Sequence, residues 1–474
     1  MATTYLTRTP ASDGNRKTWT FSAWVKRTET DEGRILSTWI TSETKDGTIH
    51  LYPDGELVVA DYDGSSYITN LKTNRFFLDT SGYYHIVVAS DTTQAVDTNR
   101  VKIYVNGVQE TSFATETYPA QDTEWTGITE DVAQVIGRKG DASTQYFNGL
   151  MTHIQFVDGL QLAPTEFGEF DSTSGIWKIK TSCYATPGTN GYCLKMETTS
   201  GSGMGTDSSG EGNNFTEAGS PTQTVDNPSN VMCTLNPLFA NTNGDANNTN
   251  QGSLTYTSTT RSVWNNMNGT LGASTGKYYW EVKYTQLIDA STIYMSSEGV
   301  ASADLPAGTV NLGEGTRSGY GYGWLCGNRN TTGNTRYLKT VDGAATLTTD
   351  SNNTPVIVND VVGVAWDGTN GKLWFHKNGT WIDDTSGNVG DPTNGTYPYH
   401  TGMETGILYT PWSDVWQNSS GSLLIKSYNF GNGYFGTTII SSAGTSSTGD
   451  DSIWEYDCPT GFYGLNTKNI NTYG

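Results

Sequence analysis

Long apolar segments are absent from this sequence of 474 residues. No run of about 18 apolar residues occurs, which argues against a membrane-spanning helix. The first residues, Met1 to Pro10, also lack the apolar segment of a signal peptide. We therefore expect synthesis in a cytoplasm and no membrane insertion.

Cysteine is scarce and widely spaced. The five residues are Cys183, Cys193, Cys233, Cys326 and Cys458. Their number is odd and no C-x-x-C pair occurs, so a zinc site or a disulfide framework is not expected. Cys183 could pair with Cys193, but we favour the unpaired interpretation.

Positive charge is also in short supply. Against 48 Asp and Glu there are only 27 Lys and Arg, which gives a net charge of −21. Phosphate groups would be repelled, so nucleic acid and anionic membranes are excluded as main partners. Charged residues make up only 16% of the chain, which separates it from charge-rich disordered proteins.

Aromatic residues and glycine are plentiful, and they favour strands and turns over helices. Aromatics reach 12% and glycine 55 residues, enough for cores and many turns. Trp19, Phe21, Ala23 and Val25 alternate onto one face of a predicted strand, while Trp24 points the other way. This pattern predicts a sheet that is covered on both sides.

Two β-rich blocks contain the same local module. His85 to Ser90 precedes an alternating strand that ends at Asn106-Gly107, and Val361 to Trp366 precedes one that ends at Asn378-Gly379. Asn-Gly is the strongest short hairpin signal. The sequence therefore predicts two sandwiches, in residues 1–170 and 254–456. A connector rich in Ser, Gly and Asn spans 171–253, and a tail spans 457–474.

Residues 18–167 resemble a laminin-G-like domain of the concanavalin A-like type. The motifs that carry this resemblance are Trp19-Thr-Phe-Ser-Ala-Trp-Val25, Tyr84-His85-Ile-Val-Val, Val101-Lys-Ile-Tyr-Val-Asn-Gly107, Ile136-Gly137 and Phe147-Asn-Gly-Leu-Met-Thr-His-Ile-Gln-Phe156. The resemblance implies a sandwich of a kind that often binds glycans.

Residues 276–431 resemble a SPRY domain. Its markers follow in the expected order: Gly276-Lys-Tyr-Tyr-Trp-Glu-Val282, Gly319-Tyr-Gly-Tyr-Gly-Trp324, Val362-Gly-Val-Ala-Trp-Asp367, Gly371-Lys-Leu-Trp-Phe-His-Lys-Asn-Gly379 and Asn429-Phe-Gly431. The fold class that the two resemblances imply is all-β, with two tandem concanavalin A-like jelly-roll sandwiches joined by an irregular connector.

The connector looks like the joint between such domains in structural proteins of tailed phages, notably marine ones. Asp207 to Thr216, Pro228-Ser-Asn and Thr234-Leu-Asn-Pro237 carry this likeness. It implies a virion surface protein, either a fibre, an appendage or a head or tail decoration. Its partners would be other virion proteins and host-surface glycans, and it would be homo-oligomeric or present in many copies on the virion.

The residues give no sign of catalysis. Concanavalin-like glycanases place two carboxylates on one strand face through a Glu-x-Asp-x-x-Glu motif, and no such spacing occurs. Glu281 is expected to face outward from its strand. None of the five His lies in a nucleophile motif, and no Gly-x-Ser-x-Gly elbow occurs. We expect no enzyme activity and no cofactor.

Calcium is a weaker alternative for one pair of acidic residues. Asp61 and Asp63 precede Gly64 and could supply oxygen ligands. An Asp-Gly turn explains them without a metal, and we favour the turn.

Glycan binding is predicted from aromatic residues in polar, glycine-rich segments. Sugar rings stack on exposed Trp and Tyr, while amides and carboxylates bind the hydroxyl groups. The candidates are Trp381, Tyr397, Tyr399, Trp412, Asp414 and Trp416, which we place in loops. Packing of the same aromatic side chains onto a neighbouring subunit explains them equally well.

Three functions therefore stay open. The leading hypothesis is host-surface binding without catalysis. A structural cement without a ligand and a polysaccharide depolymerase are the alternatives. Residues 1–17 and 457–474 are candidates for anchoring to another virion protein, or are frayed termini.

Overall fold

The computed structural model describes most of the chain. The described residues are 3–40, 43–140, 143–197, 203–238, 248–250, 254–258, 264–287, 294–304, 320–328, 335–341, 344–384, 386–417 and 424–474. Within these ranges the regular structure is almost entirely β, as predicted. Three short helices complete it: η1 (Asp97–Asn99), η2 (Pro164–Glu166) and α1 (Thr467–Tyr473).

The chain forms two compact units. The first comprises Met1–Gln223 with Asn227–Ser229, and the second comprises Thr224–Asp226 with Asn230–Gly474. In each unit two mainly antiparallel sheets enclose an apolar core. The prediction of two all-β sandwiches is therefore confirmed.

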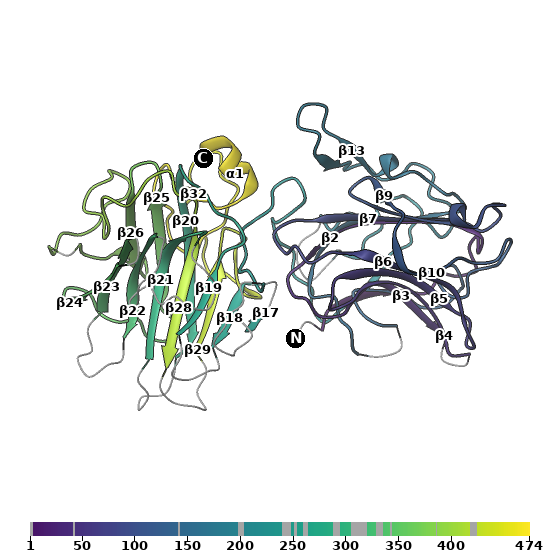
Figure 1. Ribbon diagram of the computed structural model, residues 1–474, viewed down its shortest axis with the longest axis horizontal. Helices are drawn as coiled ribbons and strands as arrows, with labels where there is room; N and C mark the ends of the chain where they lie inside the picture. The colour runs from purple at the N-terminus through teal and green to yellow at the C-terminus, as the bar shows by residue number, and fades with distance from the viewer. Residues whose placement is uncertain are drawn as a thin grey trace. The chain divides into compact units, whose positions relative to one another are not determined.

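In the first unit the two sheets lie face to face, as Figure 1 shows. The eight-stranded sheet has the order β10 (Phe113–Thr117), β6 (Tyr67–Phe76), β5 (Glu56–Tyr62), β4 (Lys45–Leu51), β3 (Gly33–Ile40), β11 (Gln134–Ile136), β1 (Tyr5–Arg8), β16 (Thr216–Ala218). The six-stranded sheet has the order β15 (Tyr192–Leu194), β12 (Gly149–Asp158), β2 (Thr18–Arg27), β7 (Tyr84–Asp91), β8 (Val101–Val105), β9 (Val108–Glu110).

Both faces of strand β2 are covered, as its sequence pattern predicts. Trp19, Phe21, Ala23 and Val25 are fully buried in the core between the sheets. On the opposite face Trp24 stacks on His85 with a ring-centroid distance of 4.6 Å. His85 in turn stacks on Trp177 with a centroid distance of 5.8 Å. Trp177 belongs to a hairpin of β13 (Gly168–Phe170) and β14 (Trp177–Ile179). This hairpin therefore covers the outer face of the six-stranded sheet.

The predicted connector is not a separate segment in the structure. Its strands β15 and β16 extend the two sheets of the first unit, while residues from Asn230 onward belong to the second unit. Residues 198–202, 239–247 and 251–253 of this stretch lie outside the described residues. The Ser, Gly and Asn content of the stretch concealed these strands, because each is only three residues long.

A disulfide between Cys183 and Cys193 corrects the preference for unpaired cysteines. Cys193 lies in β15 opposite Gln155 of β12, and the chain returns from Cys183 so that the two Cα atoms are 5.8 Å apart. That distance suits a disulfide. The sequence separation of ten residues did not reveal this return. Cys233, Cys326 and Cys458 are buried and form no disulfide.

The second unit repeats the two-sheet plan. One sheet has the order β17 (Asn248–Asn250), β18 (Thr255–Ser258), β29 (Leu424–Asn429), β20 (Lys277–Gln286), β25 (Val361–Asp367), β26 (Lys372–Lys377), β27 (Thr380–Trp381), and β32 (Tyr463–Gly464) pairs with β20. The other has the order β19 (Trp264–Asn268), β28 (Tyr409–Gln417), β21 (Tyr294–Ser302), β22 (Tyr320–Asn328), β23 (Thr335–Val341), β24 (Ala344–Asp350). β30 (Tyr434–Phe435) and β31 (Thr438–Ile439) form a small hairpin.

The C-terminal residues are an integral part of the second unit. Residues 454–464, here called the C-terminal cover, bury Trp454, Cys458 and Phe462 against Tyr279 and Trp374. Helix α1, beside β32 in Figure 1, is capped at its N-terminus by Asn466, whose side chain accepts a hydrogen bond from the Asn469 amide. The alternative of a frayed tail at 457–474 is therefore wrong, because these residues close the outer face of a sheet.

None of the helices in the described ranges has the length and apolar character that a membrane crossing requires.

Candidate ligand-binding site

The segment from Tyr409 to Trp416 is a strand and not the predicted loop. It forms β28, paired on both sides with β19 and β21. Tyr409 and Val415 alternate into the core between the sheets. Pro411 and Ser413 occupy the positions of the same face between them, and a proline and a serine there hid the period of two in the sequence.

Trp412 and Asp414 are consequently buried rather than exposed. The Asp414 carboxylate accepts hydrogen bonds from the Trp412 indole at 2.5 Å and the Asn266 amide at 2.6 Å. Ser297 donates to its second oxygen at 3.2 Å. These groups stabilise the sheet, and both residues leave the list of ligand-binding candidates. Trp416 is half-buried in the same strand.

Tyr399 is also buried, which corrects its assignment to an exposed loop. Its hydroxyl donates to Asp350 at 2.9 Å, and its ring packs edge-on against Phe375 at 5.5 Å. The neighbouring Tyr397 differs, since half of its side chain is exposed, at 50%. Between Tyr397 and Tyr399, therefore, the chain passes from the surface into the core.

Trp381 is partly exposed and lies in a short edge strand, not in the predicted loop. It lies in β27 directly opposite His376 of β26, and the two rings meet edge-on at 5.1 Å. Tyr456 of the C-terminal cover contacts the same imidazole at 5.4 Å. Trp381 and Tyr456 are both partly exposed, so two aromatic side chains flank one buried ring.

Tyr397 is connected to this region through Trp374. The Trp374 indole donates to the Thr396 carbonyl at 2.8 Å, which fixes the residue before Tyr397. Trp381 packs against the buried cluster that contains Trp374. Trp381 and Tyr456 thus flank His376 of β26, and the backbone before Tyr397 is held to Trp374 of the same strand. We call Trp381, Tyr397 and Tyr456 the aromatic edge.

A chain of hydrogen bonds fixes the imidazole beneath the aromatic edge. The Gly379 amide donates to Nδ1 of His376 at 3.2 Å, so the ring proton resides on Nε2. Nε2 then donates to the Tyr279 hydroxyl at 2.6 Å, and Tyr279 donates to Glu281 at 3.1 Å. Burial lowers the pKa of His376 to about 3, so the ring stays neutral at ordinary pH.

Glu281 corrects a further expectation, because it is completely buried and does not face solvent. Its side chain points away from the core between the sheets, but the C-terminal cover encloses it. The carboxylate accepts hydrogen bonds from the amides of Glu455 at 2.9 Å and Tyr456 at 2.8 Å, and from Asn429 at 3.1 Å. Burial raises the pKa of Glu281 to about 7, and these hydrogen bonds oppose that rise.

Negative charge lies near the aromatic edge. The Asn394 side chain donates to Asp391, and the Thr445 amide donates to Asp457. These hydrogen bonds lower the pKa of each carboxyl group below its ordinary value. Both groups are therefore ionised at neutral pH, and an anionic ligand would be repelled.

The calcium candidates in the first unit do not combine into a site. Both carboxylate oxygens of Asp61 accept hydrogen bonds from Thr126, at 2.6 and 2.9 Å. Asp63 forms a turn in which the amides of Ser65 and Ser66 donate to its carboxylate at 2.8 Å. Among the residues that the structure describes, no group of three or more His, Cys, Asp or Glu is placed to hold a metal ion.

The sequence did not single out Tyr456 or His376 as site residues. Tyr456 follows His376 by 80 positions, so no local pattern connects them. The one available signal was His376 itself, a polar residue on the side of β26 opposite Leu373 and Phe375.

Comparison with protein families supports the fold of the first unit. Residues 2–163 match a family model described as the concanavalin A-like lectin/glucanases superfamily. The class of fold is thus concanavalin A-like, which confirms the laminin-G-like resemblance of this region. No curated protein matches the chain.

Three solved structures are similar to parts of the chain or most of it. Domains LG4-5 of the mouse laminin alpha1 chain are 10% identical, with a TM-score of 0.28, over 89% of this chain and 85% of that one. The SPRY domain of human HERC1 is 14% identical, with a TM-score of 0.25, over 37% and 87%. A native heptameric SAP-like pentraxin from Limulus polyphemus is 16% identical, with a TM-score of 0.26, over 34% and 72%.

Proposed function

We propose that the chain binds a neutral glycan at the aromatic edge and catalyses no reaction. The observation that supports this is the pair of partly exposed rings, Trp381 and Tyr456, held against one buried imidazole. Rings fixed in this way lose little conformational freedom when a ligand stacks on them. Sugar rings present apolar faces that suit such stacking.

The charge around the aromatic edge favours a neutral ligand over an acidic one. Asp391 and Asp457 are ionised, and the whole chain carries a net charge of −21. An acidic polysaccharide would be repelled both locally and at long range. Hydroxyl groups of a neutral sugar could instead donate to carboxylates at the rim of the site.

The hydrogen bonds of three buried carboxyl groups support the proposal of binding without catalysis. Glycoside hydrolysis needs two carboxyl groups that face each other across one bond. Asp61, Glu281 and Glu298 have raised pKa values because they are buried, but each is engaged in its own set of hydrogen bonds. None of these three groups belongs to an open acid–base pair.

A separate part of the proposal concerns the location of the chain on a virus particle. It rests on the order of the laminin-G-like domain, the connector and the SPRY-like domain, which resembles structural proteins of tailed phages. We propose that the chain is a multicopy virion surface protein whose second sandwich binds glycans of the host surface. Immunogold electron microscopy of a particle that carries this chain would test the placement.

Binding is tested with the full chain on a glycan array that contains neutral and acidic oligosaccharides. For a neutral glycan that binds, we expect Trp381→Ala and Tyr397→Ala each to weaken the affinity about tenfold, which is about 1.4 kcal/mol. Tyr67→Ala is the matched control, because Tyr67 is as exposed as Tyr397, at 54%, but lies in the first unit. Thermal unfolding of every variant excludes a general loss of fold.

The other outcomes separate the alternatives. If no glycan binds, or if Tyr67→Ala weakens binding as much as Trp381→Ala, binding at the aromatic edge is rejected. Loss of particle stability without the protein would then favour a structural cement. Release of reducing ends from host polysaccharide would favour a depolymerase.

A further inference from the structure

A lysine and a glutamate meet in the core of the second unit, far from the surface. Lys426 of β29 and Glu298 of β21 belong to opposite sheets, and their relative exposures are 0% and 1%. The Lys426 Nζ lies 2.8 Å from the Glu298 carboxylate. The pair therefore joins the two sheets through side chains alone.

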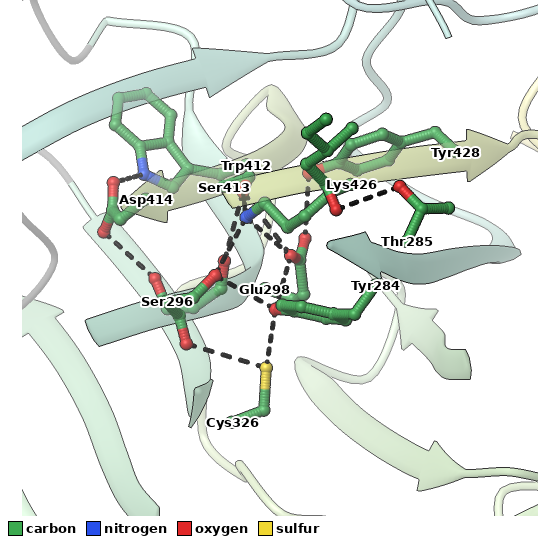
Figure 2. A network of polar contacts seen from close by, with 12 residues as sticks. Tyr284, Thr285, Ser296, Glu298, Cys326, Trp412, Ser413, Asp414, Lys426 and Tyr428 are labelled. Carbon is green, nitrogen blue, oxygen red and sulfur yellow. Dashed lines mark hydrogen bonds and ion pairs between the residues drawn. The ribbon is translucent and has the colours of Figure 1, made fainter. Parts of the chain in front are cut away.

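The surroundings of this pair are polar but sealed. Figure 2 shows the hydroxyl groups of Ser296, Ser413, Tyr284 and Tyr428 directed at the two groups. Tyr284 donates to one oxygen of Glu298 at 3.0 Å, and Tyr428 donates to the other at 3.3 Å. On the lysine side, Nζ donates to both serine hydroxyls. All four of these side chains are buried.

A sealed site makes the neutral form of the pair accessible. Two charges buried together in a medium of low dielectric lose their hydration, and moving one proton from Nζ to the carboxylate removes both charges. Burial favours the protonated carboxyl group of Glu298, although Lys426 and the tyrosines oppose that rise in its pKa. Proton transfer leaves a free amine in contact with a carboxylic acid, with no net change in protons.

We propose that Lys426 and Glu298 form an intramolecular amide bond that cross-links the two sheets of the second unit. The lone pair of Nζ attacks Cδ of the protonated Glu298 carboxyl group, and a C–N bond forms. The C–OH bond then breaks, and the hydroxyl group leaves with a second proton from Nζ as one molecule of water. The ammonium and carboxylate of the pair thus give one amide and one water, with no other reactant.

The neighbouring hydroxyl groups fit the roles that this reaction requires. Tyr284 and Tyr428 donate to different oxygens of Glu298, so one of them is placed to donate to the oxygen that becomes negative during the attack, as preorganised donors do in acyl transfer, and the other contacts the hydroxyl group that leaves. The two serine hydroxyls accept from Nζ and orient it. The fixed contact also makes the reaction unimolecular. The entropy cost of bringing two separate groups together, which is a large part of the barrier to such reactions, is therefore avoided.

The cross-link would constrain the second unit strongly. It would close a loop of 128 residues between β21 and β29. Closure of a long loop reduces the freedom of the unfolded chain more than closure of a short one. This inference does not depend on glycan binding, because the pair is remote from solvent.

The test is peptide mapping of the purified full chain by mass spectrometry after denaturation and digestion with trypsin. In the cross-linked chain, cleavage after Lys426 is lost, and residues 284–317 remain joined to residues 378–468. We expect this branched peptide to weigh one water, about 18 Da, less than the sum of its parts. Fragmentation should place the link at Glu298 and Lys426.

The peptide-mapping experiment is completed by a time course of refolding and by one variant. After refolding, the branched peptide should increase while the linear peptides 284–317 and 378–426 decrease. Lys426→Arg keeps a buried cation but should release 284–317 as a linear peptide. Linear peptides alone in the folded wild-type chain, at every time point, would overturn the proposal. That result is decisive even if the variant fails to fold.

Discussion

At the scale of single residues, burial decides the behaviour of the ionisable groups. Asp61 was a calcium candidate in the sequence, and in the structure it is a buried carboxyl group bound to Thr126. Burial raises its pKa from 3.8 to about 7, against the opposing effect of the Thr126 hydrogen bonds. Asp63, two residues away, is partly exposed, and hydrogen bonds from Ser66 and Ser65 lower its pKa.

These opposite shifts predict opposite dependences of stability on pH. The folded state holds a proton on Asp61 that the unfolded state has lost, so its contribution to the unfolding free energy falls between pH 3.8 and about 7. Asp61→Asn should remove this fall, so that the variant gains stability relative to the wild type as the pH rises through that window. Urea unfolding across the pH range measures the effect.

Asp63→Asn is the control for this prediction. Its lowered pKa gives a contribution that is present above the ordinary carboxyl pKa and lost in acid. The variant should therefore lose stability relative to the wild type as the pH rises through the acid range. Parallel profiles for the wild type and Asp61→Asn would contradict the assignment of a raised pKa to Asp61.

At the scale of elements, the two sandwiches use the same turn in the same way. Asn106 and Asn378 have φ values of 50° and 53°, and each side chain accepts the amide of a neighbouring strand at 2.8 Å. The following glycines both have a φ of 78°. A Cβ at Gly107 would lie 2.4 Å from the Trp177 ring, and one at Gly379 would lie 2.7 Å from the Tyr456 ring. Each turn thus leaves room for an aromatic side chain from a later segment.

The disulfide of the first unit gives a prediction at this scale. Closing ten residues with a cross-link should stabilise the unit by up to about 3 kcal/mol. We expect the double variant Cys183→Ser with Cys193→Ala to lower the unfolding free energy by that amount in denaturant titrations. The lost bond is the one that ties β15 to the segment around Cys183.

Reduction of the wild type serves as the matched comparison. Dithiothreitol should lower its stability to that of the double variant and should leave the double variant unchanged. Equal stability of the wild type with and without the reductant would show that the disulfide contributes nothing measurable.

At the scale of the whole molecule, two separate cores predict two unfolding transitions. The first core contains Phe156, and the second unit buries Phe462 of the C-terminal cover against Trp374. Both phenylalanines are almost completely buried. Replacing either by alanine removes a large side chain and leaves a cavity, which costs about 3–5 kcal/mol.

Scanning calorimetry of the two variants distinguishes the units. Phe462→Ala should lower the midpoint of one transition, and Phe156→Ala should lower the midpoint of the other. A shift of both transitions by Phe462→Ala would mean that the C-terminal cover stabilises more than the second unit. The pair of variants is matched in residue type, burial and change of volume.

Much of the fold was determined by the sequence itself. The alternation of Trp19, Phe21, Ala23 and Val25 and the Asn-Gly turns are local, and a strand or a tight turn follows from neighbouring residues alone. The candidate site was only half predictable. Tyr397 is exposed and Trp381 is partly exposed, while Tyr399, Trp412 and Asp414 are buried.

Only the tertiary structure decided which faces of the sheets are open to solvent. Glu281 is enclosed by the amides of Glu455 and Tyr456, which are more than 170 positions away in the sequence. The contact of Lys426 with Glu298 likewise brings together strands of opposite sheets. A period of two determines that a side chain leaves one face of a strand, but what meets it there depends on the path of the rest of the chain.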